Sequence, residues 1–210
     1  MSPIKRRTFL KAGLGSTVIG FPSLGQALGA NDRVQVALVG CGGRGTQVTS
    51  SLASRSDVVC TQLCDIHEER LVRTADFIAK QQGGRKPLLA THMEEIFANK
   101  DVDAVVVATP DHWHTPAAIL ACQAGKDVYV EKPFSHNIWE GRKLVEAARK
   151  YKRVVQVGTQ NRSAPYNLAA RDYIQSGKLG DVRLVKVFNL KGGGPFNLGA
   201  PGQAPSGFPW

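Results

Sequence analysis

The stretch that most constrains this chain is VQVALVGCGGRG at 34–45, an apolar run followed by glycines at 40, 42 and 45. The apolar run predicts a buried strand, and the glycines have the GxGxxG spacing found where a strand turns into a helix. Gly40 permits the tight turn, Gly42 lets a ligand approach the backbone, and Gly45 allows close contact between helix and strand. Because a helix N-terminus attracts phosphate, this loop predicts a dinucleotide site. The predicted cofactor loop also contains Cys41, Gly43 and Arg44.

A second apolar run, at 58–64, is followed by Asp65, at about the distance where an acidic residue is expected to bind the ribose of the dinucleotide. This context matters because a chain of 210 residues with 22 glycines also produces GxGxxG by chance. A glycine turn without a ligand is therefore the alternative interpretation. A carboxylate accepts ribose hydroxyls but repels a 2′-phosphate, so Asp65 predicts NAD as the cofactor. NADP remains the alternative cofactor, because Arg44 or Arg70 could reduce the preference of the site for NAD.

Composition excludes several classes of protein. Apolar residues make up 42% of the chain, which is enough for a buried core. The net charge of +10 includes four basic residues in the first thirty positions, which hold no acidic residue, so +6 remains for the rest. No basic stripe with interleaved aromatic residues accompanies this charge, so no nucleic-acid partner is expected. The cysteines have no CxxC spacing and are predicted to be small buried groups without a metal or redox role: Cys41, Cys60, Cys64 and Cys122.

The first thirty residues have the pattern of a targeting segment, with a basic start, a modestly apolar stretch and ALGA at 27–30. KRRTFLK at 5–11 resembles a twin-arginine export signal, although Lys5 stands where that signal usually has serine or threonine. We therefore expect the twin-arginine export machinery as a partner and a periplasmic or extracellular location. An uncleaved membrane anchor is the alternative, against which the five glycines of the segment argue.

From Arg33 onward, apolar runs of strand length alternate with segments of helical periodicity, which predicts a parallel sheet covered by helices on both faces. Five strands are clear and a sixth is expected near Leu88. After the first strand, the clear ones are predicted at 58–64, 104–108, 127–130 and 154–157. Helices are predicted after Gly45 and, from an amphipathic pattern, at 137–151. Capping patterns predict three more, which begin at Asp65 with Glu68, at Thr91 with Glu94 and at Thr115 before Pro116. Residues 31–158 are thus predicted to form a Rossmann-type α/β domain.

The pattern changes after Gly158. A helix is predicted at 166–175, a turn at GKLG 177–180 and an alternating strand at 182–188, whereas 191–210 has six glycines and four prolines without periodicity. One helix and one strand cannot bury both faces of an independent domain. We therefore expect residues 159–210 to be the incomplete start of an α+β substrate domain, and the chain to be a fragment.

Two polar motifs follow predicted strands, ATPDHWH at 108–114 and EKP at 131–133. The carboxyl ends of parallel strands share one edge of a sheet, and the glycine turn opens there as well. Together with GCGGRG at 40–45, CD at 64–65 and GKLG, this set resembles the Gfo/Idh/MocA family, which includes glucose-fructose oxidoreductase and inositol dehydrogenases. The resemblance covers 33–188. It implies a nicotinamide-dependent oxidoreductase acting on a sugar or polyol, and we expect a homo-oligomer at full length.

The resemblance also assigns site residues. It implies that Lys132 lies near the substrate hydroxyl and the nicotinamide, where a lysine can transfer a proton. Thr109 and Pro110 match the segment beside the nicotinamide ribose. Glu131 is expected to orient Lys132 or to touch the cofactor. Two further residues are expected at the site: His114 to contact cofactor or substrate, or else to cap the following helix, and Gln160 to face the cleft beside the cofactor.

Two other functions stay open at this point. NAD-dependent glycosidases of the same family use transient oxidation at the same cofactor site to assist glycosidic cleavage. The third possibility is a non-catalytic exported binder of a dinucleotide or a sugar. It draws on one departure from the family, whose DxxxH segment in the second domain has no counterpart because no histidine follows His136. No metal is expected at His112 and His114, since no cysteine or carboxylate cluster supports them.

Overall fold

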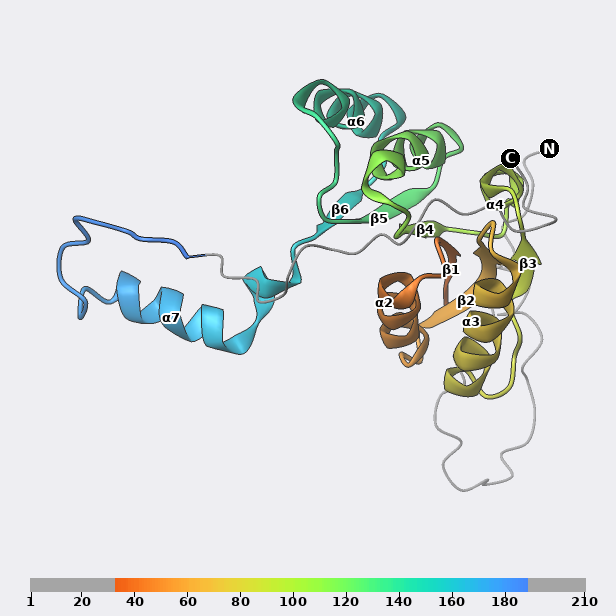
Figure 1. The fold of residues 1–210 in the computed structure, drawn as a ribbon, viewed down its shortest axis with the longest axis horizontal. Coiled ribbons are helices and arrows are strands. Elements are labelled where there is room, and N and C mark those ends of the chain that lie inside the picture. Colours follow the sequence, from red (N-terminus) through yellow and green to blue (C-terminus); the bar gives the residue numbers. More distant parts are fainter. Residues whose placement is uncertain (1–32, 189–210) are drawn as a thin grey trace, which may run out of the picture.

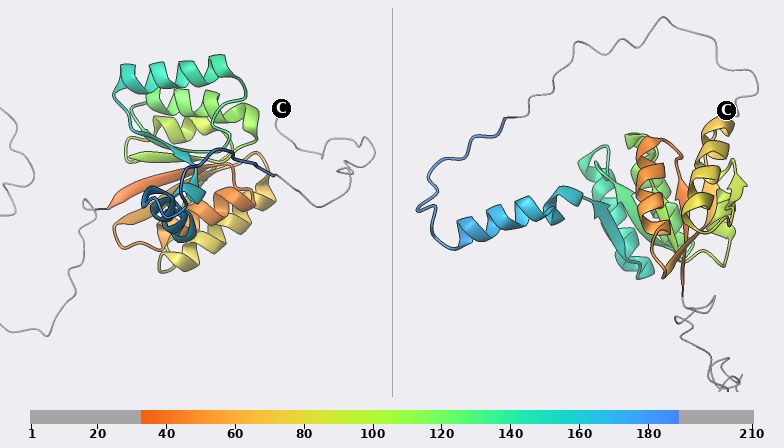
Figure 2. Two further views of the ribbon diagram at one scale, coloured as in Figure 1. Left: turned by 90° about the vertical axis from the view of Figure 1, so that its left-hand side faces the viewer. Right: turned by 90° about the horizontal axis from the view of Figure 1, so that it is seen from below.

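The computed structural model describes residues 33–188, in which six parallel strands form one sheet with helices on both faces (Figures 1 and 2). The strand order is β3-β2-β1-β4-β5-β6, so the direction of winding reverses between β1 and β4. This is a Rossmann-type α/β arrangement, as predicted. Its elements are β1 (Val34–Val39), α2 (Gly43–Ala53), β2 (Val58–Cys64), α3 (Glu68–Gln81), β3 (Leu88–Ala90), α4 (Met93–Ala98), β4 (Ala104–Val107), α5 (Asp111–Gln123), β5 (Asp127–Glu131), α6 (Ile138–Tyr151), β6 (Val155–Gly158), the 3₁₀ turn η2 (Gln160–Ser163) and α7 (Pro165–Gln175).

The central strands are apolar along their length because both faces of the sheet are buried. In β1, Ala37 and Val39 pack in the core beneath α4, α5 and α6, whereas Val36 and Leu38 pack in the core beneath α2 and α3. All four side chains are at most 4% exposed. Figure 2 shows the two helical layers on opposite sides of the sheet. Because successive side chains of a strand point to opposite faces, β1 contributes to two separate cores.

The strands are in register at their carboxyl ends. Val39 lies beside Cys64 of β2 and Val107 of β4, and Val107 lies beside Val130 of β5. The residues that follow these strands consequently begin at one edge of the sheet. The sixth strand expected near Leu88 is confirmed as β3, which pairs with β2.

Two helix starts in the first half of the domain differ from the predicted ones. Helix α2 begins at Gly43, within the glycine motif itself. Helix α3 begins at Glu68 with His67 as its N-cap, so the prediction of Asp65 as the cap is wrong. The Asp65 carboxylate accepts the backbone N–H of His67 at 2.8 Å, and the helix start lies two residues beyond the predicted one. Aspartate readily makes such a turn with the N–H two residues on.

Two later helix starts also differ. Helix α4 follows His92, one residue beyond the predicted Thr91. Helix α5 begins at Asp111 after Pro110, so Pro116 lies inside the helix. The prediction that Thr115 caps this helix is wrong, because its hydroxyl donates to the carbonyl of Phe134 at 2.8 Å. The Thr115 hydroxyl thus makes a long-range contact in place of the helix cap that the local sequence predicted.

Beyond β6 the chain leaves the sheet, and α7 extends away from the domain (Figure 1). Helix α7 matches its predicted range within a residue and has no buried residue. The predicted strand at 182–188 is wrong, since these residues are exposed and form no strand. A strand needs a partner for its backbone groups, and none pairs with this segment in the part of the chain described. The predicted signal segment at 1–30 and the loop at 191–210 lie outside the described residues.

The four cysteines are confirmed as buried free thiols. Burial raises the pKa of the Cys60 and Cys64 thiols to about 12, because a buried thiolate loses its hydration. Within residues 33–188, no group of three or more His, Cys, Asp and Glu side chains is placed to hold a metal ion. No helix in that range is long and apolar enough to cross a membrane.

Candidate dinucleotide site

Gly40 and Gly45 are glycines for steric reasons within the protein. Gly40 has φ of +99°, and a Cβ there would lie 2.6 Å from the carbonyl oxygen of Ala108 at the end of β4. A Cβ on Gly45 would collide with the Gly40 carbonyl and lie 3.1 Å from Cδ1 of Leu38. These two glycines let helix α2 start directly against β1 and β4, as the sequence motif predicts.

Gly42 is different, because no protein atom lies within 4 Å of the place where its Cβ would be. It is the N-cap of α2, with φ of −67° and ψ of 176°, which any residue adopts. The first turn of a helix leaves N–H groups without partners inside the helix, and its partial positive charge favours phosphate. The open space over Gly42 and Gly43 therefore fits the pyrophosphate of a dinucleotide.

Asp65 follows β2 and is held by two backbone groups. Its Oδ2 accepts the N–H of Cys41 at 2.7 Å, and its Oδ1 accepts the N–H of His67 at 2.8 Å. Each carboxylate oxygen keeps a further acceptor site. The side chain is thus fixed beside the glycine turn and can still accept two ribose hydroxyls.

A cavity of about 630 Å³ opens at this edge of the sheet. Its walls include the predicted Gly40, Gly42, Asp65, Thr109 and Pro110. The other side of the wall comes from residues following β2, β3 and β4, of which only Arg70 was expected near the cofactor: Ile66, Arg70, Thr91, Met93, His112 and Trp113. The signal for them was positional, since each lies within a few residues of the carboxyl end of a parallel strand or at the start of the next helix.

Glu131 and Arg44 form an ion pair that joins the glycine turn to β5. Arg44 Nε donates to Glu131 Oε1 at 2.8 Å, and the Glu131 side chain is only 4% exposed. The Tyr129 hydroxyl donates to the same oxygen at 3.2 Å, and the N–H of Lys132 donates to Oε2 at 3.2 Å. A Cβ on Gly158 would lie 2.8 Å from Oε1, so the neighbouring strand leaves room for this carboxylate. Of the two predicted roles for Glu131, the contacts favour orienting Lys132.

Burial raises the pKa of Tyr129, and the adjacent Glu131 carboxylate adds to the effect. Both influences disfavour a phenolate, because burial penalises charge and a second negative charge would face the carboxylate. Tyr129 therefore acts as a hydrogen-bond donor to Glu131. The two Glu131 oxygens thus accept from Tyr129, from Arg44 of the glycine turn and from the backbone N–H of Lys132.

Eight predicted site residues are not part of the cavity wall. Cys41, Gly43, Arg44 and Gly45 belong to the glycine turn and Glu131 to the ion pair, which leaves Lys132, Gln160 and His114. Lys132 is exposed directly after β5, and Gln160 is exposed in η2, after β6. Both follow strands at the same edge of the sheet as the cavity. His114 is 2% exposed in the second turn of α5, and its Nδ1 lies 2.6 Å from the carbonyl oxygen of Pro133. The structure thus places His114 behind the EKP motif and does not bring it to the cavity.

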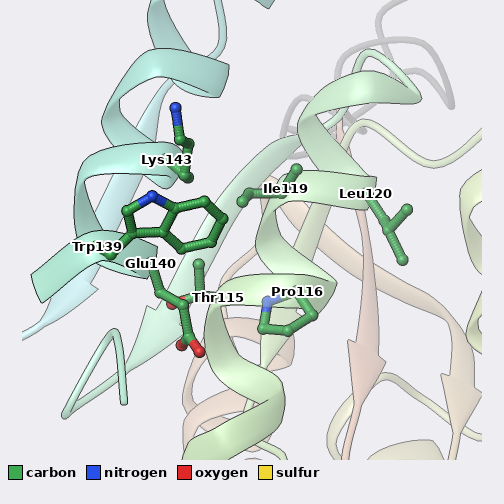
Figure 3. A pocket seen from close by; sticks show the side chains of 7 residues that line it. All are labelled: Thr115, Pro116, Ile119, Leu120, Trp139, Glu140 and Lys143. Carbon is green, nitrogen blue, oxygen red and sulfur yellow. The ribbon is translucent and has the colours of Figure 1, made fainter. Parts of the chain in front are cut away.

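A second, smaller hollow of about 380 Å³ lies between α5 and α6 (Figure 3). Thr115, Pro116, Ile119 and Leu120 line it from α5, and three residues line it from α6. These three are Trp139, Glu140 and Lys143. The hollow is on the helical layer that packs over β4 and β5, and it is separate from the cavity at the glycine turn.

The glycine turn, the fixed carboxylate and the cavity define a dinucleotide-binding domain at the switch point of a Rossmann sheet. The chain belongs to the Gfo/Idh/MocA family. The model of this family, described as an oxidoreductase family with an NAD-binding Rossmann fold, matches residues 34–159. This part of the chain is accordingly an NAD-binding domain.

Individual relatives agree with the family. A glycosyl hydrolase family 109 protein from Saccharopolyspora erythraea is 31% identical over 176 residues, covering 72% of this chain and 38% of that protein. The WlbA dehydrogenase from Bordetella pertussis, solved with NADH and UDP-GlcNAcA, has a TM-score of 0.63 at 26% identity, covering 70% and 43% of the two chains. A putative myo-inositol dehydrogenase from Sinorhizobium meliloti has a TM-score of 0.59 at 28% identity, covering 70% and 42%. This chain thus spans less than half the length of these proteins.

Proposed function

We propose that this protein is an NAD-dependent oxidoreductase that acts on a carbinol carbon of a sugar or polyol, with Lys132 handling the proton of the hydroxyl. The observation that carries the proposal is the ion pair between Arg44 and Glu131. It ties the turn that fits the cofactor phosphates to the strand end that bears Lys132. The sugar nucleotide named for the Bordetella structure and the inositol named for the Sinorhizobium one support this substrate class.

Different residues of the chain would bind different parts of the cofactor. The turn at 40–45 and α2 would hold the pyrophosphate, Asp65 the ribose of the adenosine, and Thr109 with Pro110 the other half of the cofactor. When bound, NAD supplies a carbon that accepts or returns a hydride. Glu131 fixes the backbone N–H of Lys132, and the Lys132 amine is left free to exchange a proton with a substrate hydroxyl. Gln160 would border the cofactor where the chain passes to residues 159–210, the proposed start of a substrate domain.

A Lys132→Met variant of the full-length protein tests the role of Lys132, with Lys100→Met as the matched control on an exposed turn remote from the site. NADH formation is followed over a panel of sugars and polyols that includes myo-inositol and UDP-sugars. Loss of a general acid–base group costs about 10²–10⁴ in kcat, so Lys132→Met should lose at least about 100-fold while NAD still binds. Turnover by Lys132→Met at the rate of the control would refute the assignment.

The glycosyl hydrolase family 109 relative favours a second candidate, cleavage of a glycosidic bond with transient oxidation and no net redox change. The same cofactor and Lys132 would serve both reactions. Incubation with p-nitrophenyl glycosides and NAD distinguishes them. Release of nitrophenol without accumulation of NADH supports the glycosidase, whereas NADH that grows in step with oxidised sugar supports the dehydrogenase. A full-length protein that binds NAD and does neither supports the third candidate, a non-catalytic binder.

We further propose that the protein is exported by the twin-arginine route to the periplasm or beyond, on the strength of KRRTFLK at 5–11. That route carries folded proteins, so the NAD domain would fold and load its cofactor before transport. Changing Arg6 and Arg7 together to lysine should keep the protein in the cytoplasm, because a receptor reads the arginine pair and not its charge alone. Cell fractionation measures this. Unchanged export of the double variant would indicate an ordinary secretory signal.

A further inference from the structure

Two consecutive polar side chains on α5 reach across to the loop that follows β5. His114 Nδ1 lies 2.6 Å from the carbonyl oxygen of Pro133, and Thr115 Oγ1 lies 2.8 Å from the carbonyl oxygen of Phe134. A carbonyl oxygen only accepts hydrogen bonds, so both side chains are donors, and the proton of the imidazole bond sits on Nδ1. We refer to His114 and Thr115, with the two carbonyls that they hold, as the carbonyl clamp.

The clamp is not explained by the needs of the core. His114 and Thr115 are 2% and 1% exposed, and burying a polar side chain costs free energy unless its hydrogen bonds are made. The next buried positions of the same helix, Ala117 and Ala118, are fully buried alanines. Nε2 of His114 makes no hydrogen bond to a protein group in the described range. Apolar residues would therefore fill these positions at lower cost if packing alone decided them.

The clamp acts on the segment that carries Lys132. The Glu131 carboxylate accepts the backbone N–H of Lys132 at 3.2 Å and is itself held by Arg44. The clamp holds the carbonyls one and two residues after Lys132. The main chain is thus fixed on both sides of Lys132, from α2 on one side and from α5 on the other, while the Lys132 side chain stays exposed.

We propose that His114 and Thr115 are positioning residues, which set the place of Lys132 relative to bound NAD without touching cofactor or substrate. This inference rests on the proposed function of Lys132. Neither residue lines the cavity at the glycine turn, so their removal should leave NAD affinity nearly unchanged. Displacing a reacting group by about 1 Å can cost on the order of 100-fold in rate, which is a sufficient reason to hold this loop from two sides.

Matched substitutions distinguish the effect of the clamp hydrogen bonds from the effect of side-chain packing. His114→Asn keeps an amide donor near the place of Nδ1, whereas His114→Gln carries its amide out toward the place of Nε2. Thr115→Ser keeps the hydroxyl, whereas Thr115→Val keeps the shape and removes it. Each pair therefore compares a side chain that can hold its carbonyl with one of similar size that cannot. Because the pairs act on different carbonyls, each tests the clamp independently.

The readout is the acetylation rate of the Lys132 amine in the full-length protein, followed by peptide mass with saturating NAD⁺ or with saturating NADH. NAD⁺ carries a positive nicotinamide that NADH lacks, and a neighbouring cation favours the neutral amine, which is the form that reacts. The ratio of the two rates thus reports how near Lys132 lies to the nicotinamide, and it requires no substrate. Calorimetric titration of NAD⁺ and thermal unfolding are measured on the same samples.

In the wild type, His114→Asn and Thr115→Ser, the NAD⁺ rate should exceed the NADH rate by at least about threefold. In His114→Gln and Thr115→Val the ratio should fall toward one, while NAD⁺ affinity and the unfolding temperature stay near those of the wild type. A ratio that persists in both of these variants would overturn the clamp. So would failure of both to fold, because the two residues would then serve the fold itself. A ratio of one in NAD-loaded wild type would instead refute the proposed role of Lys132.

Discussion

Alanine at Gly42 should weaken NAD binding and leave the fold intact. The backbone angles at Gly42 suit any residue, and a Cβ there would meet no protein atom within 4 Å. Replacing glycine by alanine in an allowed conformation gains about 0.4–1 kcal/mol from the unfolded chain, and the poorer N-cap costs a similar amount. We therefore expect the free energy of unfolding of Gly42→Ala to stay within about 1 kcal/mol of the wild type.

The effect of Gly42→Ala on NAD affinity should be large. The methyl group would occupy the open space over the first turn of α2, where the pyrophosphate has to approach the N–H groups. We expect the dissociation constant for NAD to rise at least about tenfold, which corresponds to about 1.4 kcal/mol. Calorimetric titration of NAD measures this, and urea unfolding followed by circular dichroism measures stability.

Gly45→Ala supplies the contrasting variant, three residues further along the same turn. Its Cβ would collide with the carbonyl oxygen of Gly40, a backbone atom that cannot turn away. Overpacking costs about 1–3 kcal/mol even where side chains yield, so we expect at least about 3 kcal/mol here. Wild-type NAD affinity in Gly42→Ala would refute the placement of the pyrophosphate, and a stable Gly45→Ala would refute the steric account of the motif.

Asp65, Gly158 and Cys60 can each be tested in the same way. Asp65 should make NAD bind more tightly than NADP, and Asp65→Ser should narrow that gap by about tenfold in paired titrations; NADP binding as tight as NAD in the wild type would contradict this. Gly158→Ala should lower the free energy of unfolding by about 1–3 kcal/mol, because its Cβ would lie 2.7 Å from the Tyr129 hydroxyl and 2.8 Å from Glu131; urea unfolding at wild-type concentrations would disprove the contact. Burial raises the pKa of Cys60 to about 12, so at pH 8 only about 10⁻⁴ of this thiol is ionised. Iodoacetamide should therefore label Cys60 only after denaturation, and rapid labelling of the native protein would exclude its burial.

Local patterns in the sequence were enough to predict the sheet and the glycine turn. Both depend on local rules, since period-two apolar runs bury strands and a GxGxxG turn needs glycine where neighbouring backbone comes close. The same rules placed Gly40, Gly45 and Asp65 at the correct edge of the sheet, because the carboxyl ends of parallel strands coincide. The family resemblance pointed to Lys132 and Glu131 on the next strand along that edge.

The hydrogen-bond partners of the polar groups, in contrast, depend on long-range packing. Asp65 and Thr115 were predicted as helix caps, but their side chains hold Cys41 and Phe134, 24 and 19 residues away. The Arg44–Glu131 ion pair joins residues 87 positions apart, and no local sequence pattern predicts it. The expected strand at 182–188 has the right alternation, yet it forms no strand without a partner. Local sequence fixes which side chains can donate, accept or pack. Only the folded chain determines which partner is within reach, because each hydrogen bond is made with whichever group packing brings within about 3 Å.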